Sequence, residues 1–197
     1  MDCMKGLIHI PDKFFQLSIC DPPYGIDIMA SGRLVREKGL SYSDWDVTIP
    51  SKEYFEELMR VSDNQVIWGG NYFPLPPTKC YLIWDKQQPE SISYASAELA
   101  WTSFSSVTKT WYRRPQGEQR IHPVQKPVDL YKWILHHYAA TGNKNLDTHM
   151  GSQSCRIAAY LMDFDFWGWE IDNGYFERGN KRFKEAAMQL RFIMPNS

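Results

Sequence analysis

The chain has 197 residues, enough for one sizeable hydrophobic core and too few for two ordinary domains. Hydrophobic residues make up 43% and charged residues 23%, which excludes an intrinsically disordered chain, and the net charge of −1 excludes a uniformly basic coat for nucleic acid while allowing a local basic patch. No apolar run reaches the about 20 residues of a membrane helix, and no signal peptide is recognisable, so we expect no membrane association.

The first half of the chain predicts several strands and one helix. Residues 17–20 form a short apolar run that the following Pro-Pro pair must end, which is typical of a buried strand. Residues 25–50 carry Gly, Ser and mixed charges with little periodicity and are predicted to form a long mobile loop. A helix is expected over 52–61, with Ser51 as its N-cap. Further strands are predicted over 65–68, 80–84 and 97–104.

The second half alternates between helix and strand. Pro127 suits the first turn of a helix that extends to about residue 140. A strand over 144–147, a helix over 152–162, a strand over 166–170 and a helix over about 172–191 follow. This order predicts an α/β fold, with a mostly parallel twisted sheet that is covered by helices on both faces.

The first candidate site is Asp21-Pro22-Pro23-Tyr24, at the end of the first strand. The exocyclic amine of a nucleobase is a poor nucleophile because its lone pair is delocalised into the ring. The carboxylate of Asp21 and the carbonyl of Pro22, oriented by Pro23, would each accept one N–H of such an amine, and Tyr24 would stack on a flipped base. The alternative is a proline-stiffened turn whose aspartate caps nearby amides.

The second candidate site follows the strand over 144–147, where a Gly-containing turn leads into a helix. Glu170 comes nineteen residues after Gly151, at the position where an acid accepts hydrogen bonds from ribose hydroxyls. Gln153 stands where a second glycine of a dinucleotide fingerprint is expected, which argues against NAD or FAD and is compatible with a nucleoside cofactor without phosphates. The alternative is an ordinary turn between a strand and a helix.

Two further segments are less specific. His122-Pro123-Val124-Gln125-Lys126-Pro127 is by itself a loop that leads into a helix, and Lys126 near the helix start could bind a carboxylate. A second segment interleaves basic and aromatic residues, a composition that is typical either of a surface that binds phosphates and stacks bases or of a solvated loop. Its residues are Lys109, Trp111, Tyr112, Arg113, Arg114 and Arg120.

Cysteine and histidine spacing predicts no metal site. The four cysteines are widely separated and form no CxxC pair, which indicates reduced thiols in a cytoplasmic protein. His136 and His137 have no acidic or cysteine partner at ligand spacing.

Together these motifs resemble the amino-group DNA methyltransferases that use S-adenosylmethionine, in the circularly permuted beta group whose catalytic tetrapeptide precedes the cofactor motif. Three segments match in that group's order: residues 21–24, residues 122–127 (H-P-T-Q-K-P in relatives), and residues 147–152 followed by Glu170. The resemblance implies a Rossmann-like methyltransferase fold in one domain over 1–197, without a separate target-recognition domain. Its parts would be a catalytic region over about 1–105, a short basic linker over about 106–121 and a cofactor-binding region over about 122–191.

The resemblance also implies roles for single residues. The catalytic residues would be Asp21, Pro22, Pro23 and Tyr24. The cofactor-binding residues would be Asp2, Cys3, Gln125, Lys126, Asp147, Thr148, His149, Gly151, Ser152, Glu170 and Ile171. The residues that bind DNA would be Lys109, Arg113, Arg114 and Arg120. The loop over 68–71 would close over the target pocket.

The expected function is therefore site-specific, metal-free methylation of the N6 amino group of adenine in DNA, in a restriction–modification context, and the family resemblance suggests a homodimer. N4-cytosine methylation is the main alternative, and the Asp at the start of the tetrapeptide favours adenine. RNA is a weaker alternative substrate. A non-catalytic remnant is also considered, because the cofactor turn departs from the Asp-Pro-Phe-x-Gly-Ser-Gly of relatives at Thr148, His149 and Gln153. A dinucleotide-dependent oxidoreductase would leave the Asp21-to-Tyr24 segment unexplained.

Overall fold

The computed structural model describes residues 1–27, 46–89, 91, 94–115 and 120–193. Its elements in chain order are α1 (Cys3–Leu7), β1 (Phe15–Cys20), α3 (Lys52–Val61), β2 (Ser62–Trp68), the 3-10 turn η1 (Gly70–Tyr72), β3 (Tyr81–Asp85), β4 (Ala97–Thr102), β5 (Lys109–Tyr112), α4 (Val128–Tyr138), β6 (Lys144–Asp147), α5 (Ser154–Leu161), β7 (Asp165–Gly168) and α6 (Asn173–Ile193). The predicted alternation of strands and helices after Pro127 is confirmed, with bounds that shift by a few residues at most.

The strands of the described residues form a seven-stranded sheet in the order β5-β3-β4-β2-β1-β6-β7. β1 pairs in parallel with β2 and β6, β6 with β7, and β3 with β5, whereas β4 is antiparallel to both of its neighbours, β2 and β3. The predicted mostly parallel α/β sheet is confirmed. The carboxyl ends of the six codirectional strands therefore lie at one edge of the sheet, where ligands bind in open α/β folds. Because β4 runs the opposite way, its first residues, Ala97 and Glu98, lie at this same edge.

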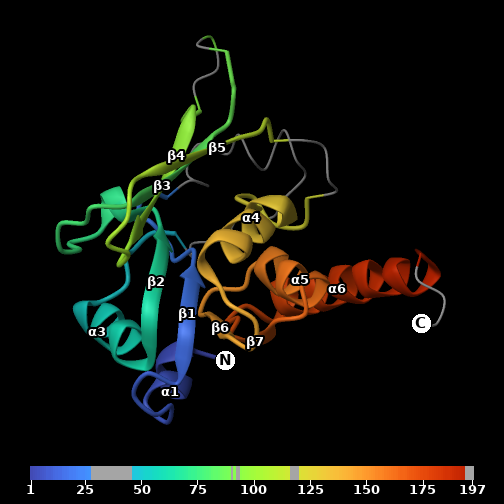
Figure 1. Cartoon of the computed structure of the whole chain (residues 1–197), viewed down its shortest axis with the longest axis horizontal. Coiled ribbons are helices and arrows are strands. Elements are labelled where there is room, and N and C mark those ends of the chain that lie inside the picture. Colours follow the sequence, from blue (N-terminus) through green and yellow to red (C-terminus); the bar gives the residue numbers. More distant parts are fainter. Residues whose placement is uncertain (28–45, 90, 92–93, 116–119, 194–197) are drawn as a thin grey trace.

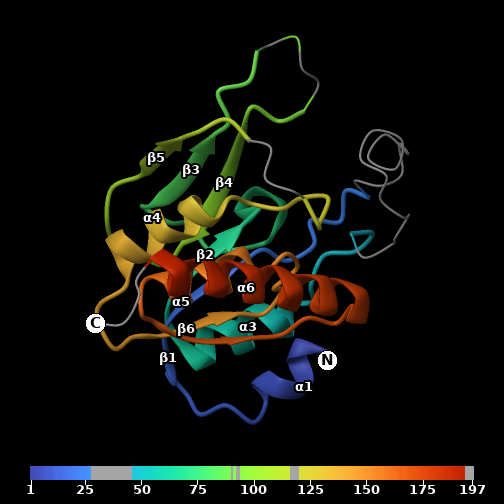
Figure 2. The same cartoon turned by 90° about the vertical axis from the view of Figure 1, so that its right-hand side faces the viewer.

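Helices cover both faces of the sheet, as predicted (Figure 1). On one face, α3 packs Tyr54, Phe55, Leu58 and Val61 against a core that includes Ile67 of β2. On the opposite face, α4 and α5 cover a second core. In β2, Val66 and Trp68 belong to this core and Ile67 to the first, as the period of two in a strand requires. The buried members of the second core include Leu17, Ile19, Val66, Trp68, Leu130, Ile134 and Ala158. Figure 2 shows α6 lying along α5, on the side away from α3.

Several predictions of local structure need correction. Ser51 occupies the N-cap position of α3, but within the described structure its side chain makes no capping hydrogen bond. Helix α1 was not predicted, and β5 lies within residues 106–121, where we expected a linker. Of the predicted loop over 25–50, residues 28–45 lie outside the described part of the chain, and the flanking residues have no helix or strand. The rest of the domain layout and the permuted motif order stay predictions.

Buried cysteines contribute to both cores. Cys20, Cys80 and Cys155 are buried, Cys3 is partly buried, and all four are free thiols. Among the residues that the structure describes, no group of three or more His, Cys, Asp or Glu side chains is arranged to hold a metal ion. The same residues include no helix that is both long and apolar enough to cross a membrane.

Candidate active site

Two cavities open at the carboxyl-end edge of the sheet. One, of about 490 Å³, lies beside β3 and β4 and is lined by residues that include Trp84, Lys86 and Glu98; we call it the β3–β4 cavity. The other, of about 420 Å³, lies beyond β6 and β7, with Gly151 and Glu170 in its wall; we call it the β6–β7 cavity. The two cavities share four lining residues: Tyr24, Val124, Gln125 and Lys126. Tyr24 of the predicted catalytic tetrapeptide and residues 124–126 thus form the boundary between the cavities, whereas Asp21, Pro22 and Pro23 line the β6–β7 cavity.

The Asp21-to-Tyr24 segment leaves β1 as an irregular turn that points between the cavities. The Tyr24 hydroxyl donates a 2.6 Å hydrogen bond to Oδ1 of Asp21. Asp46 fixes the backbone of this turn, because its Oδ1 accepts the backbone N–H groups of Tyr24 and Gly25 at 2.6 and 3.2 Å. Burial raises the pKa of Tyr24 well above its usual value, so the hydroxyl stays protonated. Within the described residues, Asp46 accepts the backbone amides of this turn, and the contacts of Asp21 are with the side chains of Tyr24 and Lys126.

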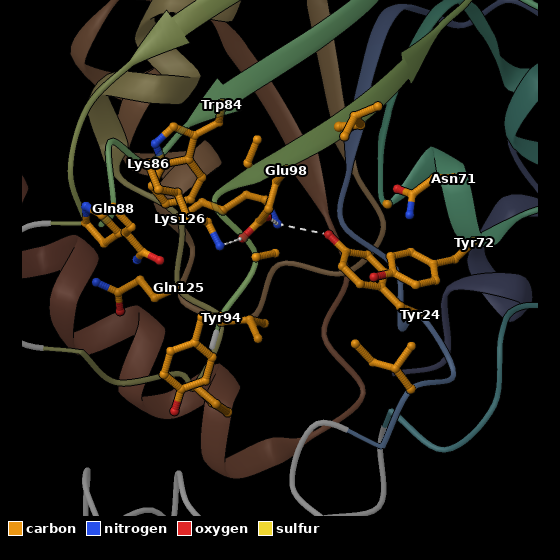
Figure 3. A pocket seen from close by; sticks show the side chains of 18 of the residues that line it. Tyr24, Asn71, Tyr72, Trp84, Lys86, Gln88, Tyr94, Glu98, Gln125 and Lys126 are labelled. Atoms are coloured by element: carbon orange, nitrogen blue, oxygen red, sulfur yellow. Dashed lines mark hydrogen bonds and ion pairs between the residues drawn. The ribbon is translucent and has the colours of Figure 1, made fainter. Parts of the chain in front are cut away.

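Lys126 is the central cation of the site (Figure 3). Its Nζ lies 2.5 Å from Oδ2 of Asp21, 3.2 Å from the Tyr24 hydroxyl and 3.1 Å from Oε2 of Glu98. Its side chain is only 2% exposed. Burial opposes the charge, but the two carboxylates outweigh burial and raise the pKa of Lys126 above its usual value. We predicted that Lys126 binds the cofactor; it does line the β6–β7 cavity, but its ammonium contacts the carboxylate of Asp21.

Burial also controls the charge state of Asp21. Desolvation raises its pKa, and the Lys126 ammonium and the Tyr24 hydroxyl act in the opposite direction. Each carboxylate oxygen has two lone-pair directions, so contacts with Tyr24 and Lys126 leave Asp21 able to accept a further N–H. The arrangement can therefore hold an exocyclic amine.

Sequence reasoning missed three residues of the site: Glu98, Lys86 and Tyr72. Glu98 is the second residue of β4 and pairs through Oε1 with Lys86 at 2.6 Å, and the two lysines lower the pKa of Glu98 to about 2 despite its burial. Tyr72 stacks on Tyr24, with ring centroids 5.0 Å apart and an angle of 11° between the planes. The only sequence signal for Glu98 and Lys86 was a charged residue at the end of an apolar strand. That the two lie close together follows from the register of β3 and β4, in which Trp84 pairs with Glu98, and the sequence does not reveal this register.

The β6–β7 cavity collects most of the predicted cofactor-binding residues. His149, Gly151, Ser152, Glu170 and Ile171 line it together. The Glu170 carboxylate accepts the backbone N–H of Gly151 at 2.7 Å and that of Asp172 at 2.9 Å, which fixes the carboxylate at the end of β7. Ile171 is 71% exposed and offers an apolar surface at the cavity wall.

Asp147 and Thr148 lie just behind this cavity and are almost fully buried. Asp147 accepts the backbone N–H of His149 at 3.0 Å, and burial raises the pKa of Asp147 to about 8. The Thr148 hydroxyl is hydrogen-bonded with the hydroxyl of Tyr54 at 2.6 Å and with Nδ1 of His149 at 2.9 Å. Both residues therefore stabilise the turn of the predicted cofactor site and do not form the surface of the cavity.

Asp2 and Cys3 are placed at the start of α1, where Asp2 caps the helix by accepting the N–H of Met4 at 2.9 Å. They are not among the lining residues given for the β6–β7 cavity. Their contact with a cofactor stays a prediction.

Gln153, the main departure from the relatives' turn, points away from the cavity. Its backbone adopts a left-handed conformation with φ of 59°, and its side chain donates to the carbonyl of Phe176 in α6 at 3.2 Å. Gly179 leaves the space for it, because a Cβ there would lie 2.6 Å from Nε2 of Gln153. Arg182 of α6 donates to the carbonyl of Ser152 at 2.8 Å. The altered turn is thus joined to α6 and leaves the β6–β7 cavity open.

The basic residues predicted to bind DNA do not share one environment. Arg113 forms an ion pair with Asp129, and Nε of Arg114 donates to the carbonyl of Gln87 at 3.1 Å. Arg120 lines the β3–β4 cavity, and Lys109 begins the edge strand β5. Of these four residues, Arg120 is the one that lines a cavity together with Tyr24.

Comparison with known proteins decides the family. A family model described as a DNA methylase, N6_N4_Mtase, matches residues 78–181, just over half of the chain. The chain belongs to this DNA methylase family. Within it, the type II methyltransferase M2.MboI of Moraxella bovis is 25% identical over 173 residues, a match that covers 84% of this chain. The matched region is 58% of that relative's length, so the chain spans well under two thirds of it.

Solved structures confirm the methyltransferase fold. The complex of M1.HpyAVI with SAM superposes with a TM-score of 0.61 at 18% identity and covers 92% of this chain and 96% of that one. TTHA0409 of Thermus thermophilus, described as a putative DNA modification methylase and complexed with S-adenosylmethionine, gives 0.57 at 19% identity, with coverage of 94% and 91%. The cytosine-N4-specific PvuII DNA methyltransferase gives 0.60 at 11% identity, with coverage of 96% and 90%.

Proposed function

We propose that this DNA methylase family member transfers a methyl group from S-adenosylmethionine to the N6 amino group of adenine in DNA. The observation that carries the proposal is that Tyr24 and Lys126 line both cavities, while Asp21, Pro22 and Pro23 line the β6–β7 cavity directly beside them. A transfer between two bound molecules needs such a boundary, because the donor and the acceptor must meet at one point. The β6–β7 cavity would hold the cofactor and the β3–β4 cavity the base.

The residues of the β6–β7 cavity fit S-adenosylmethionine. Its volume of about 420 Å³ lies within the usual range of small-molecule sites. Glu170 would accept hydrogen bonds from the ribose hydroxyls, and Ile171 would pack on the adenine ring. The cofactor supplies an electrophilic methyl group on its sulfonium. The departure at Gln153 gives little support to the alternative of a non-catalytic remnant, since that side chain contacts α6.

Asp21 and the carbonyl of Pro22 would hold the target amine. Methyl transfer would break the bond between the sulfonium and the methyl carbon and leave the cofactor as a neutral thioether. The amine nitrogen would gain positive charge, which the buried Asp21 carboxylate would stabilise, and would then lose its proton to Asp21 or to solvent. The base must first leave the duplex, a cost that stacking on Tyr24 returns in part. Because Tyr72 covers one face of Tyr24 and is 42% exposed, we propose that the incoming base displaces Tyr72 toward solvent.

We choose adenine over cytosine as the substrate because of one residue, Asp21, which begins the tetrapeptide. Serine is commoner at this position in the cytosine enzymes of this family. Both bases present an exocyclic amine next to a ring nitrogen, so the geometry of the site suits either. The family resemblance also supports the proposals that methylation is site-specific, occurs in the cytoplasm as part of a restriction–modification pair, and is performed by a permuted beta-group enzyme acting as a homodimer.

A transfer assay tests the proposal. The protein is incubated with methyl-labelled S-adenosylmethionine and unmethylated DNA, and the DNA is digested to nucleosides. We expect label in N6-methyladenine, none with Asp21→Ala, and normal transfer with Asp63→Ala, which removes an exposed acid near the start of β2. Label in N4-methylcytosine would overturn the choice of base, and no label with intact cofactor binding would overturn the activity.

A further inference from the structure

Four charged side chains of alternating sign form a row, in which Lys86, Glu98 and Lys126 line the β3–β4 cavity and Asp21 lines the β6–β7 cavity. Lys86 lies 2.6 Å from Oε1 of Glu98, Oε2 of Glu98 lies 3.1 Å from Lys126, and Lys126 lies 2.5 Å from Asp21. Their side chains are 13%, 22%, 2% and 15% exposed in that order, so the row is shielded from water along its length. An ion pair at this depth is sensitive to its partners, because removing one charge leaves another without compensation.

The row joins four distant parts of the chain. Asp21 follows β1, Lys86 follows β3, Glu98 is the second residue of β4, and Lys126 precedes α4. Glu98 reaches this edge because β4 alone, among the strands that the structure describes, runs against its neighbours. A residue near the start of a strand that runs the other way would lie at the opposite edge of the sheet.

The Lys126 ammonium is held on every side. Its three N–H bonds have three acceptors within reach, on Asp21, Tyr24 and Glu98. The rings of Tyr24 and Trp68 lie 5.7 and 5.2 Å from Nζ. Of these contacts, only Glu98 lies outside the catalytic tetrapeptide and also carries a charge that opposes that of Lys126.

From this geometry we propose that Glu98 is a positioning residue: it anchors the Lys126 ammonium, which in turn fixes the Asp21 carboxylate in the orientation that accepts the target amine. The inference rests on the proposed methyl transfer. Glu98 touches neither reacting atom in this account and acts through Lys126. Lys86 has the smaller role of neutralising Glu98 on its outer side, so that the acid can stay ionised while it is buried.

Kinetics of three variants test this. Glu98→Gln keeps the size and one oxygen but removes the charge, Glu98→Ala removes both, and Lys86→Met removes only the outer cation. We expect kcat for methyl transfer to fall about 10-fold in Glu98→Gln and about 100-fold in Glu98→Ala, because small misplacements of reacting groups have effects of this size. Lys86→Met should lose less than about fivefold. The KM for S-adenosylmethionine should stay within about twofold of wild type in all three.

A second readout does not depend on activity. In a ¹H–¹⁵N spectrum of lysine side chains, the buried and triply bonded Lys126 ammonium should give a signal protected from solvent exchange. It should be assigned by its loss in Lys126→Met, and it should broaden or vanish in Glu98→Gln but persist in Lys86→Met. A Glu98→Ala protein that is folded and transfers methyl groups at the wild-type rate would overturn the inference, as would a Lys126 signal that is unchanged in Glu98→Gln. If wild type itself transfers no methyl group, the proposed function fails, and the spectrum alone decides whether Glu98 anchors Lys126.

Discussion

The two cavities are built in different ways although they share a wall. In the β6–β7 cavity, polar side chains bind the backbone of nearby turns: Glu170 holds Gly151 and Asp172, and Asp147 holds His149. In the β3–β4 cavity, charged side chains bind one another across strands, as in the pairing of Glu98 with both lysines. The first cavity is therefore specified mainly by one local stretch of sequence, and the second by the register of the sheet.

The shared wall should be the most sensitive point of both cavities. Lys126→Met leaves the carboxylates of Asp21 and Glu98 buried without their common cation, so we expect the free energy of unfolding to fall by about 3–5 kcal/mol and methyl transfer to be lost. Urea denaturation measures the first effect. Lys132→Met is the matched control on α4, where the lysine is 40% exposed and pairs only loosely with Asp129 at 3.7 Å, and it should change stability by less than about 0.5 kcal/mol. Equal effects of the two variants would show that Lys126 contributes no more than a surface lysine does.

The free energy of unfolding should depend on pH through Asp147, which lies behind the β6–β7 cavity. Burial raises the pKa of Asp147 to about 8 from a usual value of 3.8. Between these two pH values the folded protein holds a proton that the unfolded chain has lost, so the contribution of Asp147 to stability falls as pH rises and is lowest above pH 8. Asp147→Asn carries no charge to bury and should raise the free energy of unfolding at pH 9 by on the order of 3 kcal/mol relative to wild type. At pH 4 the two proteins should unfold alike. A gain of the same size at both pH values would contradict this account.

Cofactor affinity should depend on the β6–β7 cavity alone. Glu170→Gln keeps one oxygen but loses the charge and one of the two acceptors that hold Gly151 and Asp172. We expect calorimetry to show about 10-fold weaker binding of S-adenosylmethionine. Glu177→Gln, an exposed position on α6, is the control and should bind like wild type. Normal affinity in Glu170→Gln would mean that the ribose is bound elsewhere.

The smallest effect is expected at the aromatic stack of the β3–β4 cavity. Tyr72→Ala removes the ring that covers Tyr24, a contact worth about 0.5–1.5 kcal/mol beyond burial. If the target base displaces this ring, the KM for DNA should fall about two- to tenfold, with no change in cofactor affinity. A rise in the KM for DNA would instead identify Tyr72 as a wall of the bound-base site.

The β6–β7 cavity could be predicted from the sequence to a greater extent than the β3–β4 cavity. The alternation of strands and helices after Pro127 has short local periods, and the turn at 147–152 with Glu170 lies in one strand–helix–strand unit, so both were accessible. Glu98 was not, because its role depends on the antiparallel pairing of β3 with β4 and on a lysine 28 residues away in the sequence. The direction of the Gln153 side chain was hidden for a similar reason, since it depends on the space at Gly179 in α6.

The most direct test of the central claim is a crystal structure with S-adenosylhomocysteine and a short DNA duplex. The account predicts the adenosine beside Glu170 and Ile171 in the β6–β7 cavity and a flipped adenine in the β3–β4 cavity, with its amine about 3 Å from Asp21 and the carbonyl of Pro22. A cofactor product bound in the β3–β4 cavity, or an amine held by Glu98 with Asp21 still paired only to Tyr24 and Lys126, would contradict it.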